Sequence, residues 1–190
     1  MARWQPGTRG RLQATALRLF ATQGYDETTV AEIAAAAEVT ERTFFRHFAD
    51  KREVLFAGQD DFTAMFTNPI EQAPDGTAPF ELVRRALDAA GAFFPEDRRT
   101  WSRERQVVID AHPALGEREL GKLAGLKVHI GDALRDRGVP EPAATMAAET
   151  AITVFHLSFA QWIADGEDRP FGAIAAERLD ALTSLVHPGR

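Results

Sequence analysis

Apolar residues along this chain recur with a helical period almost from end to end. In the first segment they fall at i, i+4, i+7 and i+8, which predicts a helix over about residues 8–22 with its apolar stripe at Leu12, Ala16, Leu19 and Phe20. Alternating runs of β-branched residues do not occur, so we expect no sheet. The same period, interrupted by Pro and Gly, predicts further helices from residue 29, over 41–48, from the turn at 50–53 to about 66, and over about 80–94, 97–111, 115–136, 143–164 and 171–186. The sequence therefore predicts an all-α fold of about nine helices.

Residues suited to capping helix N-termini support three of these starts. Thr29-x-x-Glu32 has the composition of a capping box, and Thr40 can cap the helix that follows. Asp50-x-x-Glu53 offers another box, which predicts one long, uninterrupted helix from there to about residue 66. The segment 67–79 is rich in Pro, Gly and Asp, so we expect a loop.

The predicted helix over 41–48 separates its residues by chemistry. Phe44 and Phe48 are four residues apart and face the same way, into a small core. The remaining faces, with the cap, carry hydrogen-bonding and cationic side chains and one more aromatic residue: Thr40, Arg42, Thr43, Phe45, Arg46 and His47. Such a helix, entered from another short helix, can contact base edges and phosphates in the DNA major groove. The alternative interpretation is a solvated helix pair within an α-bundle.

Charge is distributed unevenly along the chain. Its net charge is −6, which argues against a general nucleic-acid coat. Residues 1–52 hold eight Arg and Lys against six Asp and Glu, a net charge of +2, whereas the remainder carries −8. A mildly basic first segment on an acidic body suits a protein that meets phosphates at one end only.

Several motifs follow one another in register in the first quarter of the chain. They are TVAEIA at 29–34, TFFRHF at 43–48 and KREVL at 51–55, after an apolar first helix and a Gly24-Tyr25 corner. This set resembles the N-terminal domain of TetR-type transcriptional regulators over about residues 8–56 without a gap. The resemblance implies a helix-turn-helix DNA-binding domain over residues 1–52 and a helical regulatory and dimerisation domain over 53–190.

The resemblance also implies which residues meet DNA. Residues matching Thr28 and Thr29 help the N-terminus of the second helix meet phosphate, and Lys51 matches a lysine that completes the contact. With Arg46 from the helix analysis above, the predicted DNA-binding residues are Thr28, Thr29, Thr40, Arg42, Thr43, Phe45, Arg46, His47 and Lys51.

Two positions depart from the family pattern. Relatives usually carry Tyr where this chain has Phe45, so a hydroxyl that reaches a phosphate is missing. They usually carry Gly where this chain has Glu38, in the turn between the two helices. If Glu38 adopts a positive φ, it should cost about 1 kcal/mol.

The larger part of the chain resembles the regulatory domain of the same regulators in architecture and length, and from about Trp101 to Leu185 it is loosely similar to mycofactocin-associated members. The resemblance implies a small, largely apolar effector. We expect its pocket to be lined by Phe62, Phe66, Phe94, Trp101, His129, Phe155, Phe159 and Trp162, with His112 and His156 as further polar groups. Aromatic residues at helical spacing are also what a solid core requires, and that alternative stays open.

The last two predicted helices suggest a homodimer. The helix over 143–164 is apolar around most of its circumference, so it should be buried on several sides. Pairing it and the helix over 171–186 with their copies would form a twofold four-helix interface that places two DNA-binding helices at half-site spacing. Both helices could instead belong to the domain core.

Other classes of protein find little support. There is no phosphate-binding Gly loop, no His-Glu-x-x-His and no nucleophile elbow, so we expect neither an enzyme nor a cofactor. The five histidines are scattered and there is no cysteine, so we predict no metal site. Without a signal peptide or membrane span, we expect a cytoplasmic protein. The predicted function is a ligand-responsive transcriptional regulator, by analogy a repressor, that binds a palindromic DNA operator as a homodimer. A ligand-independent DNA-binding protein is the second possibility.

Overall fold

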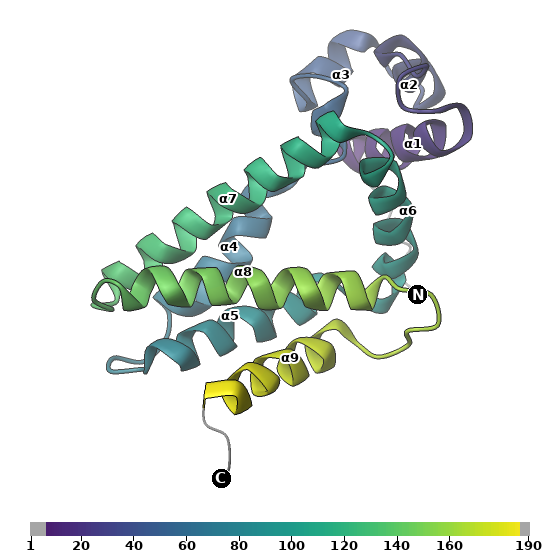
Figure 1. The fold of residues 1–190 in the computed structure, drawn as a ribbon. Coiled ribbons are helices and arrows are strands. Elements are labelled where there is room, and N and C mark those ends of the chain that lie inside the picture. The colour runs from purple at the N-terminus through teal and green to yellow at the C-terminus, as the bar shows by residue number, and fades with distance from the viewer. Residues whose placement is uncertain (1–6, 187–190) are drawn as a thin grey trace, which may run out of the picture. The chain divides into compact units, whose positions relative to one another are not determined.

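The computed structural model describes residues 7–186, and within them the chain is helical without strands. Figure 1 shows the helices in chain order. Their bounds are α1 Thr8–Gln23, α2 Val30–Ala36, α3 Glu41–His47, the 3-10 helix η1 Arg52–Val54, α4 Gln59–Glu71, α5 Pro79–Phe93, the 3-10 helix η2 Glu96–Arg98, α6 Arg99–Asp110, α7 Pro113–Asp136, α8 Ala143–Trp162 and α9 Phe171–Val186. The all-α prediction is confirmed.

The chain forms two compact units. The first contains the residues up to Gly58 together with Glu104–Glu119, which are the end of α6 and the start of α7. The second contains Gln59–Arg103 and the residues from Leu120 onward. The sequence predicted a single boundary between residues 52 and 53. It did not predict that residues 104–119 belong to the first unit although residues 59–103 belong to the second.

The first unit is built around a small apolar core. Leu12, Ile33 and Phe44 are fully buried, and Phe20 and Phe48 nearly so. This is the core that the spacing of aromatic residues on α3 predicted. Full burial of side chains of this size contributes about 1.5–3 kcal/mol each.

The second unit packs its helices around a larger core. The helices α5, α8 and α9 run alongside one another, and α4 packs on α5 (Figure 1). Fully buried Phe66, Ile70, Ile130, Trp162 and Phe171 lie at its centre.

The prediction of one long helix from residue 50 was wrong. The Asp50 carboxylate does accept the backbone N–H groups of Arg52 (2.8 Å) and Glu53 (3.1 Å), but the turn it caps is η1, which ends at Val54. Gly58 has φ +87°, a left-handed conformation that no α-helix contains, and α4 starts only after it.

The predicted loop over 67–79 was wrong in its first part. The helix α4 continues through Pro69 to Glu71 although proline removes one backbone donor. Burial explains the outcome, because Ile70 is fully buried in the core of the second unit. Packing of an apolar side chain here outweighs the local preference of Pro for a helix end.

The turn between α2 and α3 holds Glu38 in the left-handed region. Its φ is +56°, and it follows α2 where Val39 N donates to Ala34 O (2.9 Å) and Glu38 N donates to Ala35 O (3.0 Å). These two bonds form a Schellman motif, in which glycine is the usual residue at the Glu38 position. The condition for the expected strain, a positive φ at Glu38, is therefore met.

We predict that Glu38→Gly raises the free energy of unfolding by about 1 kcal/mol, because it removes the clash of a Cβ at positive φ. Urea denaturation monitored by circular dichroism measures this change. The matched control is Ala35→Gly in α2, where φ is helical and glycine should cost about 1 kcal/mol. A destabilised Glu38→Gly variant would show that the carboxylate contributes more than its backbone strain costs.

Candidate functional site

The helix α3 is short, capped and anchored on one side. The Thr40 hydroxyl accepts the backbone N–H of Thr43 at 3.2 Å, as the sequence predicted. Phe44 and Phe48 are buried, with ring centroids 5.4 Å apart. Because these two rings fix the inner face, the opposite face is presented to solvent.

The outer face of α3 carries most of the predicted DNA-binding residues. Arg42, Phe45, Arg46 and His47 are exposed, and Thr43 is half-buried. Arginine can pair bidentately with guanine or contact phosphate, and histidine and threonine can donate to phosphate oxygens. This face therefore has the composition needed to contact base edges and the DNA backbone.

The N-terminus of α2 is closed by the predicted capping box. The Thr29 hydroxyl accepts Glu32 N at 3.2 Å, and the Glu32 carboxylate accepts Thr29 N at 2.8 Å. The hydrogen bond from the Thr29 backbone holds the pKa of Glu32 below its usual value. Thr29 remains exposed, and its hydroxyl is engaged in the cap.

Thr28 is placed differently from the other predicted contacts. Its side chain is buried, and its hydroxyl donates to Gly24 O at 2.7 Å. Its backbone N–H donates to Tyr25 O at 3.3 Å. Since both donors are engaged inside the protein, Thr28 braces the turn before α2, and the expectation that its side chain meets phosphate has to be corrected.

Lys51 binds the same turn from the far end of the motif. Its ammonium donates to the backbone carbonyls of Tyr25 (2.6 Å) and Thr28 (2.9 Å) and lies 4.2 Å from the centroid of the Tyr25 ring. Burial is the main cause that raises the pKa of Tyr25 to about 12. Lys51 thus ties the segment after α3 to the start of α2, in addition to placing a positive charge there.

The corner at residues 104–119 supplies two arginines that sequence analysis did not select. Arg105 donates from Nε to Leu55 O (2.8 Å) and from Nη1 to the Glu119 carboxylate (2.8 Å), and its guanidinium lies 5.0 Å from the Phe56 ring. Burial lowers the pKa of Arg105. Arg118 donates from Nε to Glu53 at 2.8 Å. No local signal could have revealed these contacts, because the partners lie 50 and 65 residues apart.

His112 also belongs to this corner. Its ring lies 5.1 Å from the ring of Tyr25, and Nδ1 is 3.8 Å from the Asp26 carboxylate. Both partners belong to the first unit. The expectation that His112 lines an effector cavity with the aromatic residues is therefore wrong.

Most of the residues predicted to line an effector pocket pack directly on one another. Phe94 lies 5.4 Å from Phe159, 5.5 Å from Trp162 and 5.8 Å from Phe155, centroid to centroid. Phe62 and Phe66 join the same cluster through Phe155, each at 5.4 Å. Trp101 contacts Arg98 (5.6 Å), and no ring contact joins it to the cluster among the described residues.

Two polar groups are enclosed beside these rings. Ser158 and Trp162, one helical turn apart on α8, are fully buried. Within the described part of the chain, the Ser158 hydroxyl and the Trp162 Nε1–H have no hydrogen-bond partner. An unpaired buried donor costs about 1–3 kcal/mol, so a partner in this place would gain that much.

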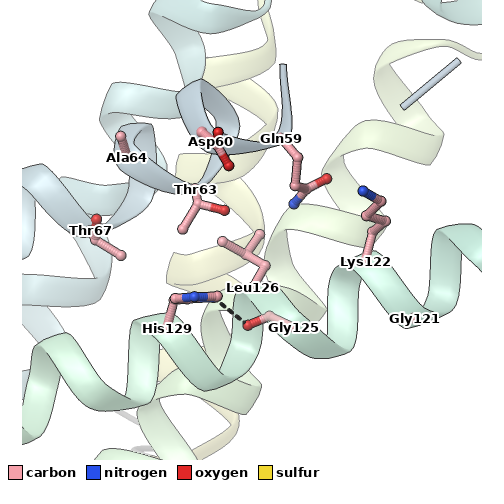
Figure 2. Close-up of a pocket in the computed structure, with 10 residues that line it drawn as sticks. All are labelled: Gln59, Asp60, Thr63, Ala64, Thr67, Gly121, Lys122, Gly125, Leu126 and His129. Atoms are coloured by element: carbon pink, nitrogen blue, oxygen red, sulfur yellow. Dashed lines mark hydrogen bonds between the residues drawn. The ribbon is translucent and has the colours of Figure 1, made fainter. Parts of the chain in front are cut away.

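A separate groove lies between α4 and α7 in the second unit (Figure 2). Its volume is about 360 Å³, within the range of small-molecule sites. The lining mixes polar and apolar groups and comprises Gln59, Asp60, Thr63, Ala64, Thr67, Gly121, Lys122, Gly125, Leu126 and His129. Of the predicted pocket residues His129 alone lines it, and its Nδ1 is 2.8 Å from Gly125 O. A carbonyl can only accept, so Nδ1 donates and Nε2 of the neutral ring is left as an acceptor.

The described residues contain neither a metal-binding cluster nor a membrane-spanning helix. No group of three or more His, Cys, Asp or Glu there could hold a metal ion. No helix in residues 7–186 is both long and apolar enough to cross a membrane.

The first unit is similar to the N-terminal domain of a family of bacterial regulatory proteins. Residues 12–57 match the model of the bacterial regulatory proteins of the tetR family. The regulator TcmR of Streptomyces glaucescens is 44% identical over 82 residues, which are 43% of this chain and 36% of TcmR. A Mycobacterium tuberculosis chain, MftR, provisionally described as a mycofactocin biosynthesis transcriptional regulator, is 25% identical over 79% of this chain and 77% of its own.

Solved structures extend the likeness to the whole fold. FadR from Bacillus subtilis, crystallised with stearoyl-CoA, superposes with a TM-score of 0.65 at 15% identity, covering 94% of this chain and 99% of FadR. Residues 12–57 therefore resemble the N-terminal domain of tetR-family regulators, and the chain has the fold seen in solved TetR-family regulators. The TcmR match spans little more than a third of that relative.

Proposed function

We propose that this protein is a cytoplasmic transcriptional regulator, without catalytic activity, that binds a palindromic DNA operator as a homodimer and represses transcription until a small molecule releases it. The observation that carries the proposal is the division of α3 into a buried aromatic face and an exposed face with Arg42, Arg46 and His47. We assign DNA binding to residues 1–52 and regulation and dimerisation to 53–190.

Release would follow from a coupled equilibrium. In one state the dimer holds its two α3 helices at half-site spacing, about 34–36 Å apart. In the other, a shift of α4 places them at a different separation. An effector that favours the second state by about 1–3 kcal/mol would weaken operator binding about 5–150-fold.

Arg42→Ala tests the DNA contacts. We expect an operator selected from random duplex DNA to be a palindrome, and the variant to bind it about 1–3 kcal/mol more weakly with relaxed base preference at one position per half-site. Electrophoretic mobility shift over a panel of single-base operator variants measures both effects.

Lys51→Ala is the matched comparison. Its charge acts on phosphates without reading bases, so we expect a nearly uniform loss across sequences and a shallower salt dependence. Lys51 also donates to the Tyr25 and Thr28 carbonyls, so the variant should be less stable. Its DNA binding therefore has to be measured well below the melting temperature of the variant. Unchanged operator affinity in both variants would refute the assignment of the DNA-binding face.

We further propose that the effector is largely apolar and binds among the aromatic residues of the second unit. The buried Ser158 hydroxyl and Trp162 Nε1–H support this location, since an effector with one polar group could pair with them. The groove between α4 and α7 is the competing location.

Two variants distinguish the locations in a thermal-shift screen against hydrophobic metabolites. Ser158→Ala removes a hydroxyl at the rings, whereas Gly125→Leu fills the groove, where an added Cβ meets nothing within 4 Å. We expect Ser158→Ala to lower the affinity for the effector about tenfold, because one buried hydrogen bond is lost, and so to reduce the thermal shift. Gly125→Leu should leave the thermal shift unchanged. The reverse result would place the effector in the groove, and no shift across broad chemical classes would count against an effector.

The proposed dimer uses the exposed side of α8 and α9. Met146 and Leu157 are 66% and 53% exposed on α8, and Leu185 on α9 is 80% exposed. Met146 and Leu157 are eleven residues apart, close to three helical turns, so they lie on one face. Apolar groups exposed to this degree on neighbouring helices are what a second subunit would cover.

We expect the native protein to run as a dimer in light scattering, at twice the 20.9 kDa of one chain. Leu157→Arg should give a monomer, because a twofold axis would bring two unpaired charges together. Leu120→Arg is the matched control, since Leu120 on α7 is 66% exposed and lies outside the proposed interface. A dimer that survives Leu157→Arg but not Leu120→Arg would move the interface to α7.

A further inference from the structure

Phe45 is a large apolar side chain presented to solvent in the middle of α3. It is 53% exposed, and Phe45 and Val107 are the exposed large apolar side chains among the described residues of the first unit. Its ring contacts Phe44 edge-on, with centroids 5.4 Å apart. The outward position of Phe45 is therefore held by a buried ring that belongs to the core.

The neighbours of Phe45 place it on the cationic face. Arg42 is three residues before it and Arg46 one residue after it, and both are exposed. Residues at i and i+3 are neighbours on a helix surface, so Phe45 and Arg42 occupy adjoining positions on the same side of α3. If α3 enters the major groove, the same docking carries the Phe45 ring to the DNA surface.

The chemistry of Phe45 limits what it can recognise there. It has no polar atom, so it can neither donate to a phosphate nor pair with a polar base edge. The apolar group that the major groove displays is the C5-methyl of thymine, and aromatic and other apolar side chains contact it. Burying the ring against that methyl would remove exposed apolar area from both partners.

We propose that Phe45 is a specificity-determining residue that packs on the C5-methyl of one thymine in each operator half-site. The proposal rests on the proposed function, DNA binding by α3. It assigns to Phe45 a base contact in place of the phosphate contact that a tyrosine hydroxyl would make. The loss of one buried methyl corresponds to about a fourfold change in affinity.

Uracil substitution tests this contact atom by atom. In the operator selected from random duplex DNA, each dT is replaced singly by dU, which removes the methyl and leaves the pairing unchanged. We expect one position per half-site at which dU weakens binding of the native protein about fourfold, and about 15-fold when both half-sites are changed. Phe45→Ala should bind the dT and dU operators equally well.

Arg46→Ala is the matched control, because it removes an exposed cationic neighbour and leaves the Phe45 ring in place. It should bind all operators more weakly while keeping the sensitivity to uracil. Thermal melting checks that Phe45→Ala is folded. Phe45→Gln is a second variant, which keeps an extended but polar side chain. It should also lose the sensitivity to uracil.

The proposal is overturned if no dT to dU change affects the native protein, or if Phe45→Ala keeps the full sensitivity. A uniform loss of affinity in Phe45→Ala, with no dependence on thymine, would instead indicate packing on deoxyribose and would also overturn it. Either result leaves DNA binding intact, whereas a native protein that selects no duplex at all would refute the proposed function and the Phe45 contact together.

Discussion

The burial of Phe44 and Phe48 is the constraint on which the first unit depends. These two rings fix which face of α3 points inward, and a helix of only seven residues has few other contacts with which to set its rotation. Since each buried ring contributes about 1.5–3 kcal/mol, their burial outweighs the exposure of Phe45 on the opposite face. The polar and cationic side chains lie outside because the aromatic pair leaves them no other place.

Cationic side chains then join parts of the first unit that are distant in sequence. Lys51 binds the carbonyls before α2, Arg105 binds the carbonyl of Leu55, and Arg118 pairs with Glu53. Hydrogen bonds of a buried charged group such as Arg105 contribute about 1.5–3 kcal/mol, whereas the partly exposed pair of Arg118 and Glu53 contributes at most about 1 kcal/mol. The residues from 104 to 119 are therefore a structural part of the first unit, although α6 and α7 both continue into the second unit. These two helices are shared physically between the part that we propose binds DNA and the part that we propose binds an effector.

The structure retains unfavourable local energies at two kinds of place. Glu38 holds a positive φ at the end of α2, beside the proposed DNA-binding helix. Ser158 and Trp162 enclose polar atoms without a partner among the described residues, beside the aromatic cluster. Departures from local consistency are expected where a site constrains the chain. Glu38 lies next to the helix that we propose binds DNA, and Ser158 and Trp162 lie next to the aromatic residues that we propose bind the effector.

The amino-acid sequence by itself determined the helical class, most helix positions, the caps at Thr29 and Thr40, and the buried and exposed faces of α3. These features depend on residues within a few positions of one another, so periodicity and capping chemistry specify them. Tertiary structure alone decided the end of α4 beyond Pro69, the burial of Thr28, the carbonyl contacts of Lys51 and the return of residues 104–119 to the first unit. It also decided that most of the predicted pocket aromatics pack on one another. Each of these outcomes depends on partners that lie far along the chain, or on burial that outweighs a local preference, and neither is encoded in local spacing.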